Sequence, residues 1–272
     1  MQTLSTNDLL HHRYHPLKEI GHGAFSRVFL AEDIQTGQPV AVKKLRQTDI
    51  SPKLRSLARL SFQREARILS RLQHPQIPRL HAYDLNGLGW FLALDFIEGE
   101  TLEQWLRHVA GGILPIPIAA CIGWKVCQVL SYLHHFSPPI KFRDLTPANI
   151  MMARNGEIYL IDFGCACPDT GTMDEDSLGT PGYSAPEQYL DQWGQSASNT
   201  QLDVYALGAI LHQMLSGEDP RFASVRFEFS SLQQRAPLAL TTLIEQYMLA
   251  LQPDARPIID QVGLHLASFA QG

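Results

Sequence analysis

Residues 142–149 read FRDLTPAN, and residues 162–164 read DFG. Asp144, Asn149 and Asp162 in these segments carry carboxylate and amide oxygens, which are the hard ligands that Mg²⁺ prefers. Each residue alone would also suit an ordinary turn or the N-terminus of a helix. The two segments therefore carry information mainly through their order and spacing, because Asp162 follows Asp144 by eighteen residues.

Length and composition predict a globular protein with two packed lobes. The chain has 272 residues, of which 45% are hydrophobic and 18% are charged, and it exceeds the roughly 100–200 residues of a typical domain. Its net charge of −5 argues against broad binding of nucleic acids, which normally requires a basic face. The four cysteines have neither the spacing of a zinc site nor the density of a disulfide framework, which is typical of a reducing cytoplasm.

The start of the chain does not resemble a targeting signal. Its first twenty residues lack a positive segment followed by an apolar core, so a secretory signal is not predicted. No run approaches the roughly 18 apolar residues of a membrane span. We therefore expect a cytoplasmic protein without a membrane partner. We interpret His11, His12 and His15 as residues of a lead-in rather than a metal site.

Strand-like segments precede helical ones along the chain. Short apolar or alternating runs separated by turn residues predict an antiparallel sheet with strands at 17–20, 27–31, 40–45 and 90–96. Apolar residues at helical spacing predict helices at 52–72, 101–110, 116–136, 201–216, 238–250 and 258–269. We expect an α+β protein with a lead-in over 1–13, a small β lobe with one main helix over 14–97 and a larger, mostly helical lobe over 98–270. A cleft between two lobes is a favoured place for a small-molecule site.

Residues 20–28 read IGHGAFSRV and are predicted to form a glycine-rich hairpin. Gly21 and Gly23 have no Cβ, so backbone N–H groups near them can approach phosphate oxygens closely. A hairpin with two glycines is more often a plain turn, so this signal is weak alone. The signal becomes stronger with Lys43, which lies twenty residues after Gly23 on a predicted strand between small apolar residues.

In this order, the motifs resemble those of the eukaryotic-type (Hanks-type) serine/threonine protein kinase domain, and the chain is similar to bacterial members of that family. The resemblance covers roughly residues 14–270. It implies a bilobal protein-kinase-like fold with an ATP cleft between the lobes. It also implies transfer of the γ-phosphate of ATP to serine or threonine hydroxyls of protein substrates, a reaction used in signalling. The cofactors implied are ATP and Mg²⁺, for which Mn²⁺ could substitute.

The resemblance assigns catalytic roles to five residues of this sequence. Lys43 would hold the α- and β-phosphates and would be oriented by Glu65. Asp144 would accept or orient the proton of the attacking hydroxyl. Asn149 and Asp162 would hold the metal ions that bridge the phosphates.

The same resemblance implies how the nucleotide is bound. Adenine would lie between Val28, Ala41 and Met151, with Leu94 behind it and the backbone of residues 97–99 at its edge. The full set of implied nucleotide-binding residues is Ile20, Gly21, Gly23, Val28, Ala41, Lys43, Leu94, Ile97 and Met151.

Residues 179–187, GTPGYSAPE, resemble the segment in which protein kinases receive their acceptor. Kinases of small molecules generally lack this segment, so it favours a polypeptide substrate over a small-molecule phosphotransferase. Thr180 within it resembles the serine/threonine class. By the same resemblance, Glu187 would pair with Arg256, and Asp203 would anchor the backbone of the catalytic loop at residues 142–149.

Residues between 164 and 179 occupy the position of the activation loop. Their hydroxyl and acidic side chains are Thr170, Thr172, Ser177, Asp169, Asp174, Glu175 and Asp176. In the family, an arginine at the position of Arg143 pairs with a phosphorylated activation loop, which predicts an autophosphorylation switch. The alternative is that the acids already supply the charge that Arg143 needs. We interpret Cys165 and Cys167 as idle thiols.

Two positions depart from the family pattern. Phe142 replaces a histidine and would keep the aromatic stack on Phe163. Thr146 replaces the lysine that neutralises the transferred phosphate, a loss that could cost on the order of 10²–10³ in rate unless Lys141 or another cation compensates. This change leaves a nucleotide-binding pseudokinase scaffold as an alternative, although the retained base and metal ligands favour an enzyme. Ala148 stands where kinases directed to basic sequences carry glutamate, so no strong preference for arginine near the acceptor is indicated. The sequence does not identify the substrate, the regulator or the oligomeric state.

Overall fold

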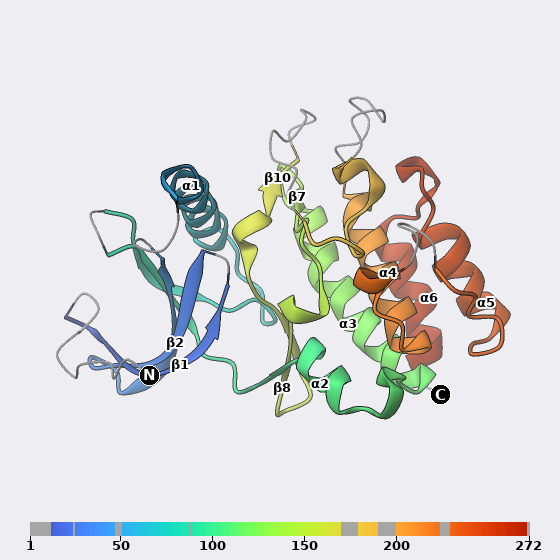
Figure 1. Cartoon of the computed structure of the whole chain (residues 1–272), viewed down its shortest axis with the longest axis horizontal. Coiled ribbons are helices and arrows are strands. Elements are labelled where there is room, and N and C mark those ends of the chain that lie inside the picture. Colours follow the sequence, from blue (N-terminus) through green and yellow to red (C-terminus); the bar gives the residue numbers. More distant parts are fainter. Residues whose placement is uncertain are drawn as a thin grey trace. The chain divides into compact units, whose positions relative to one another are not determined.

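The computed structural model describes residues 12–23, 25–46, 51–86, 89–169, 179–189, 200–223 and 229–270. The chain divides into two compact units, Met1–Glu98 and Gly99–Gly272. Figure 1 shows a sheet with helix α1 in the first unit and mostly helices in the second. This succession confirms the α+β class expected from the order of strand-like and helical segments.

The first unit is built on a five-stranded antiparallel sheet in the order β1-β2-β3-β5-β4. Its strands are β1 (Tyr14–His22), β2 (Ser26–Asp33), β3 (Gln38–Leu45), β4 (Leu80–Asp84) and β5 (Phe91–Asp95). Four of these strands overlap predicted ones, but β4 was not predicted. Strand β4 lies at the edge of the sheet and has no fully buried side chain, so its sequence does not need the apolar alternation that marks a core strand.

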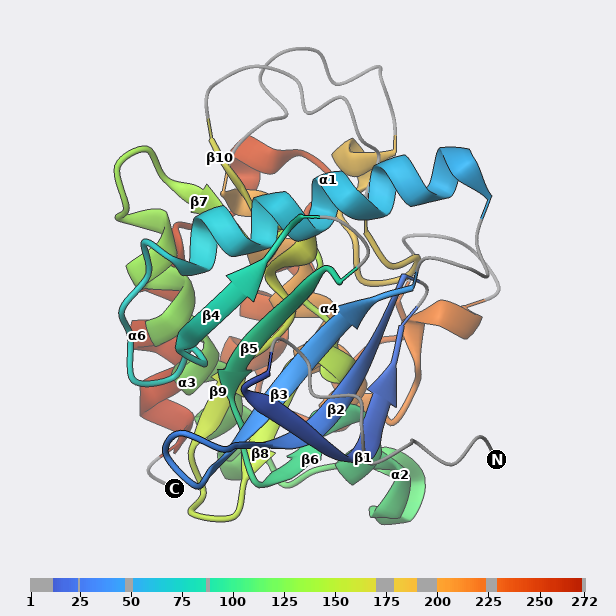
Figure 2. The ribbon, with the colours of Figure 1, turned by 90° about the vertical axis from the view of Figure 1, so that its left-hand side faces the viewer.

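Helix α1 (Pro52–Leu69) packs on one face of this sheet, as Figure 2 shows. Ser51 caps its N-terminus by accepting a hydrogen bond from the backbone N–H of Leu54. The contact with the sheet is a cluster of Leu45, Ala58, Phe62, Ala66, Trp90 and Leu92. The predicted end at residue 72 was wrong, because the N–H groups of Arg71 and Leu72 bond to carbonyls three residues back and tighten the chain out of the α-helix.

The second unit holds helices α2 (Leu102–His108), α3 (Ile116–His134), α4 (Gln201–Ser216), α5 (Leu238–Thr241) and α6 (Ile259–Ala270). A π-helical segment, Thr242–Met248, continues α5, so the single helix predicted over 238–250 was wrong in its hydrogen bonding. Single 3₁₀ turns are formed by Ala110–Gly112, Pro147–Asn149, Phe163–Cys165, Pro186–Gln188, Pro220–Phe222 and Pro253–Ala255.

Short strands fix the loops of the second unit. Strands β6 (Gly99–Thr101), β8 (Ile150–Ala153) and β9 (Ile158–Leu160) form one small sheet, and β7 (Ile140–Lys141) pairs with β10 (Cys167–Pro168). None of them was predicted, because two to four residues are too few to show an alternation. The segment 142–149 lies between β7 and β8, and the segment 162–164 lies between β9 and β10. The backbone is therefore held at both ends of each segment.

Helix α3 lies in the core of the second unit, where it packs against α4 and α6. A Cβ added at Gly123 would lie 2.9 Å from side-chain atoms of both Leu211 on α4 and Leu266 on α6, so glycine permits this close approach. Within the part of the chain that the structure describes, α3 is the one helix long and apolar enough to cross a membrane by length and composition. Its buried residues and its packing between two helices explain its apolar sequence as that of a core helix.

Candidate functional site

Lys43 and Glu65 form a buried ion pair in the first unit. The Lys43 Nζ lies 3.0 and 2.8 Å from the two carboxylate oxygens of Glu65. Their side chains are 10% and 1% exposed. Glu65 follows Phe62 by three residues on the buried side of α1, which directs its carboxylate toward the sheet. A charge buried to this extent requires a partner, so each residue holds the other in place, and the predicted contact is present.

The register of the sheet places three predicted adenine-contact residues beside Lys43. Val28 is the β2 partner of Lys43, and Leu94 is the β5 partner of Ala41. Ala41 and Lys43 lie two residues apart on β3 and so point to the same face. Val28, Ala41, Lys43 and Leu94 therefore share one face of the sheet. Ile97, which follows β5, is half-buried.

The β1–β2 hairpin contains the two predicted phosphate-binding glycines. Gly21 pairs with Val28, and the N–H of Gly23 donates to the carbonyl of Ser26 at 2.8 Å. Neither glycine has a left-handed φ, and a Cβ added to either would meet only ordinary contacts at 3.8 and 3.5 Å. The fold of this hairpin does not itself require glycine, which fits close approach by a ligand from outside. Ile20 is exposed on β1, and residue 24 lies outside the described residues.

In the second unit, hydrogen bonds gather Asp144, Asn149 and Asp162. The side-chain amide of Asn149 donates to the backbone carbonyl of Asp144 at 2.8 Å and to its carboxylate at 3.2 Å. The N–H of Ile161 donates to the backbone carbonyl of Asn149 at 2.9 Å, which holds the start of the 162–164 turn beside Asn149. Met151, the remaining predicted adenine contact, follows on β8 and is half-buried.

The side chains of Asn149 and Asp162 suit a divalent cation. Because the amide nitrogen of Asn149 is bonded to Asp144, its side-chain oxygen is the atom left to face a metal. Among the described residues, no group of three or more His, Cys, Asp or Glu side chains could hold a metal ion. Mg²⁺ is usually bound by one or two protein oxygens together with phosphates and water, so a site with two protein oxygens fits it.

Arg143 and Asp162 have left-handed backbone conformations, with φ of 70° and 64°. For a residue with a Cβ, such a conformation costs about 1–3 kcal/mol and persists only where the surroundings impose it. The Asp162 carboxylate accepts a hydrogen bond from the N–H of Gly164 at 3.2 Å, which holds the turn in this shape. Both strained residues thus lie in the two segments that the sequence singled out.

Asp203 on α4 anchors the loop at residues 142–149, as predicted. Its buried carboxylate accepts hydrogen bonds from the N–H groups of Phe142 at 2.9 Å and Arg143 at 2.8 Å. The Nε2 of His134 lies 3.0 Å from the same carboxylate, a contact that the sequence reasoning missed. The rings of Phe142 and Phe163 meet edge to face at 5.1 Å between centroids. The predicted aromatic stack is therefore present without the usual histidine.

Residues 179–189 lie against the 142–149 loop. The hydroxyl of Thr180 donates to the Asp144 carboxylate at 2.7 Å, and the Gln188 amide donates to the backbone carbonyl of Arg143 at 3.1 Å. Gly182 has a φ of 93°, and a Cβ on it would lie 2.6 Å from the carbonyl carbon of Pro220, so only glycine fits. The predicted acceptor segment is thus bonded directly to the predicted base.

The environment of Asp144 favours its protonated form relative to water. Burial raises the pKa of its carboxyl above the ordinary value of 3.8, and the nearby Asp162 carboxylate adds to that rise. Hydrogen bonds from Thr180 and Asn149 lower the pKa because they stabilise the ionised form, but the net shift is upward.

Thr180→Val should move the acid limb of the pH–rate profile to higher pH. A base acts only when ionised, so activity is lost as the pH falls through the raised pKa of Asp144. Removing the Thr180 hydroxyl removes one bond to the ionised form and raises that pKa further. The measurement is kcat/KM against pH in the acid range. Thr180→Ser keeps a hydroxyl and should restore the wild-type limb; an unmoved limb in the valine variant would exclude Asp144 as the titrating base.

Lys141 is not available to supply the positive charge that a lysine at position 146 would provide. Its side chain is fully buried, and its Nζ lies 3.7 Å from the Asp169 carboxylate.

The guanidinium of Arg143 donates to the Cys167 sulfur at 3.7 Å, and all four cysteines are free thiols. The other predicted activation-loop residues lie outside the described residues: Thr170, Thr172, Asp174, Glu175, Asp176 and Ser177.

Residues 14–262 match the family model described as a protein kinase domain. The serine/threonine-protein kinase PknA of Nostoc sp. is 34% identical over 226 residues, which are 78% of this chain and 38% of that protein. The serine/threonine-protein kinase PknB of Mycolicibacterium smegmatis is 34% identical over 231 residues, 80% of this chain and 34% of that protein. The cAMP-dependent protein kinase type 3 of Saccharomyces cerevisiae is 35% identical over 211 residues, 76% of this chain and 49% of that protein. The chain thus spans between about a third and a half of the length of these curated relatives.

Proposed function

The chain belongs to the protein kinase family, and on that premise we propose that it transfers the γ-phosphate of ATP to serine or threonine hydroxyls of protein substrates. The observation that carries this proposal is the hydrogen-bonded group of Asp144, Asn149 and Thr180. This group joins the candidate base, a candidate metal ligand and the acceptor segment. The proposed metal is Mg²⁺, with Mn²⁺ as a substitute of the same ligand preference.

Lys43 and Glu65 would bind the nucleotide phosphates. The Lys43 ammonium donates a hydrogen bond to each carboxylate oxygen of Glu65, which holds the ammonium in one position, so little reorganisation is needed when a phosphate arrives. Backbone N–H groups near Gly21 and Gly23 would approach other phosphate oxygens. The apolar side chains that share a sheet face with Lys43 would contact adenine.

Asp144 would orient the acceptor hydroxyl and take its proton. One carboxylate oxygen accepts from Thr180 and the other from Asn149, which fixes the plane of the carboxylate. Both bonds favour the ionised form that a base requires. Asn149 and Asp162 would hold the divalent cation, which supplies positive charge for the oxygens of the transferred phosphate.

The acceptor segment favours a protein substrate over a small molecule. Its bonds to Asp144 and Arg143, and the packing of Gly182 on Pro220, hold residues 179–189 as a surface on which a polypeptide can lie. The test is transfer of label from γ-labelled ATP to a general protein substrate in the presence of excess sugars and aminoglycosides. Protein labelling should be unaffected by these competitors. Loss of protein label to a small molecule would favour a small-molecule phosphotransferase instead.

Location and regulation are also part of the proposal. Four free thiols support a reducing compartment such as the cytoplasm. Phosphorylation within residues 170–178 is proposed as a switch, because Arg143 occupies the position that pairs with such a phosphate in the family. Mass spectrometry of the protein after incubation with ATP tests whether residues 170–178 become phosphorylated.

Thr146→Lys should raise the rate of phosphate transfer. Thr146 follows Asp144 by two residues and carries no charge for the transferred phosphate. A lysine at this position should increase kcat by about tenfold or more, by comparison with other transition-state donors. Steady-state kcat is the measurement, and Thr146→Met is the matched variant that adds length without charge. An unchanged kcat in the lysine variant would mean that another group already supplies this charge, and inactivity of all three proteins would favour the pseudokinase alternative.

A further inference from the structure

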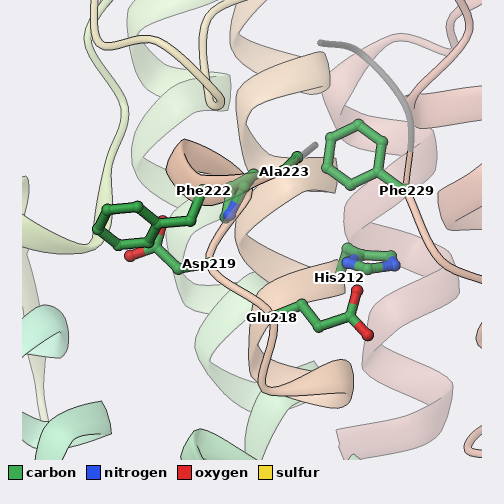
Figure 3. A pocket seen from close by; sticks show the side chains of 7 residues that line it. His212, Glu218, Asp219, Phe222, Ala223 and Phe229 are labelled. Carbon is green, nitrogen blue, oxygen red and sulfur yellow. The ribbon is translucent and has the colours of Figure 1, made fainter. Parts of the chain in front are cut away.

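A cavity of about 360 Å³ lies beside the C-terminal end of α4, outside the candidate catalytic site. Figure 3 shows the side chains that line it, including His212, Glu218 and Phe229. We propose that this cavity binds the side chain of an arginine or lysine of the protein substrate, at a distance from the acceptor hydroxyl. The proposal rests on the protein kinase function and adds a substrate class to it. The volume lies at the low end of the range for ligand pockets, about 300–1,000 Å³, which suits one side chain.

Glu218 is the negative charge that this cavity offers. Its neighbour Asp219 is already neutralised, because the Arg221 guanidinium lies 2.6 Å from the Asp219 carboxylate. Arg221 also lies 2.8 Å from Glu103 on α2, so it is shared by two acids. Within the described ranges, no lysine or arginine lines the cavity and no cation pairs with the Glu218 carboxylate. Among the described residues, a cationic ligand would therefore displace no ion-pair partner of Glu218.

His212 does not supply the missing positive charge. Its Nε2 lies 2.7 Å from the carbonyl of Ser230, and a carbonyl only accepts, so Nε2 carries a proton. Its Nδ1 lies 3.2 Å from the hydroxyl of Ser216, which can donate to it. Burial also lowers the pKa of His212 and favours the neutral ring. Figure 3 shows the Glu218 carboxylate turned toward this neutral ring.

The remaining walls suit the long apolar stem of a basic side chain. The Phe229 ring meets the His212 ring edge to face at 5.0 Å, and Pro220 adds an apolar surface. Arginine and lysine bury their methylene groups against such surfaces while the charged end seeks a carboxylate, and an aromatic face attracts the same cation. An anionic ligand would be repelled by Glu218. The combination of apolar walls and one carboxylate therefore selects a cation with an apolar stem.

The cavity wall is continuous with the acceptor segment. The backbone of Pro220 and Arg221 packs so closely on Gly182 that a Cβ there would lie 2.6 and 2.7 Å from their atoms. The Arg221 guanidinium lies 6.0 Å from the centre of the Tyr183 ring. One side of this turn thus touches the acceptor segment and the other side forms the cavity. A substrate lying on residues 179–189 can extend a basic side chain into the cavity. This contact would not depend on position 148, where alanine gives no indication of arginine recognition near the acceptor.

Binding of a fluorescent heptaarginine peptide tests the cavity without any catalysis. Glu218→Gln should raise the Kd of this peptide about tenfold in fluorescence anisotropy, as expected for the loss of one charge-assisted interaction. Glu32→Gln is the matched control, because it removes an exposed carboxylate from β2 of the first unit and should leave the Kd unchanged. Equal Kd values for wild type and Glu218→Gln would overturn the proposal.

Kinetics with two protein substrates give the second measurement. With myelin basic protein as a basic substrate, Glu218→Gln should raise KM about tenfold and leave kcat unchanged, because the cavity lies away from the reacting atoms. With casein, an acidic substrate, both constants should stay at wild-type values. An unchanged KM for the basic substrate would refute the docking site. Absence of activity in the wild type would refute the proposed kinase function instead, and the peptide-binding measurement would then decide the cavity alone.

Discussion

Asp144→Asn is expected to lower kcat for phosphate transfer by about 10²–10⁴-fold, the usual contribution of a positioned base. The asparagine amide keeps the shape of the side chain and an oxygen that can accept from Thr180, so the loop should keep its structure. It cannot take a proton from the acceptor hydroxyl. Incorporation of label from γ-labelled ATP into a general protein substrate measures the loss, and the melting temperature should stay close to that of the wild type.

Asp254→Asn is the matched control for this prediction. Asp254 is an exposed carboxylate in the Pro253–Ala255 turn, so the variant removes the same charge away from the site. It should keep the wild-type kcat. Equal labelling by Asp144→Asn and the wild type would show that Asp144 is not the base.

Arg256→Met is expected to lower the free energy of unfolding of the second unit by about 3–5 kcal/mol. The Arg256 guanidinium donates to the two carboxylate oxygens of Glu187 at 2.5 and 2.9 Å, and these side chains are 0% and 1% exposed. It also donates to the backbone carbonyls of Gln201, Ala250 and Leu251. Methionine fills part of the space but leaves a buried carboxylate without its charge partner, which is the costly outcome.

Thermal unfolding followed by circular dichroism measures this loss. A change of this size should lower the melting temperature by roughly 6–20 °C for a unit of this length. The control is Arg107→Met on α2, which breaks an exposed pair with Glu103 and should cost less than about 1 kcal/mol. A second variant that adds Glu187→Leu should recover part of the stability, because it removes the unpaired charge. A loss at Arg256 no larger than the loss at Arg107 would contradict a structural role for the buried pair.

The family and the fold class could be predicted from the sequence because both depend on the spacing of motifs and on apolar periodicity. The resemblance drawn from the spaced motifs is confirmed over residues 14–262. Long helices such as α3 and α4 were located by apolar periodicity, since sixteen or more residues give several turns of signal. The two-residue strands β7 and β10 carry no such signal, although they fix the ends of the catalytic segments.

The contacts between site residues that could be predicted came from the resemblance to the protein kinase family. Lys43 and Glu65 are an example, because the resemblance implies an acid in the helix that follows the lysine strand, and the two side chains are in contact. The bond from Thr180 to Asp144 joins residues 36 apart in sequence and depends on the fold of the acceptor segment. No local pattern in the sequence indicates it.

Two buried polar residues show what periodicity leaves undecided. His134 lies at the C-terminal end of α3, where a histidine can be exposed to solvent, yet it bonds to Asp203. Its position four residues after the buried Leu130 was the available signal, because that spacing places it near the buried side of α3. Lys141 was considered as a catalytic cation, but the pairing of β7 with β10 buries it beside Asp169. The His134–Asp203 contact depends on helix packing and the burial of Lys141 depends on strand pairing, and neither can be read from the sequence alone.

The most direct test of the proposed function identifies the residues that the wild-type protein phosphorylates. The protein is incubated with ATP, Mg²⁺ and a general protein substrate, and the phosphorylated residues are identified by mass spectrometry. A serine/threonine kinase should leave phosphoserine or phosphothreonine on the substrate. Absence of phosphate, or phosphotyrosine alone, would contradict the assignment of this chain as a serine/threonine protein kinase.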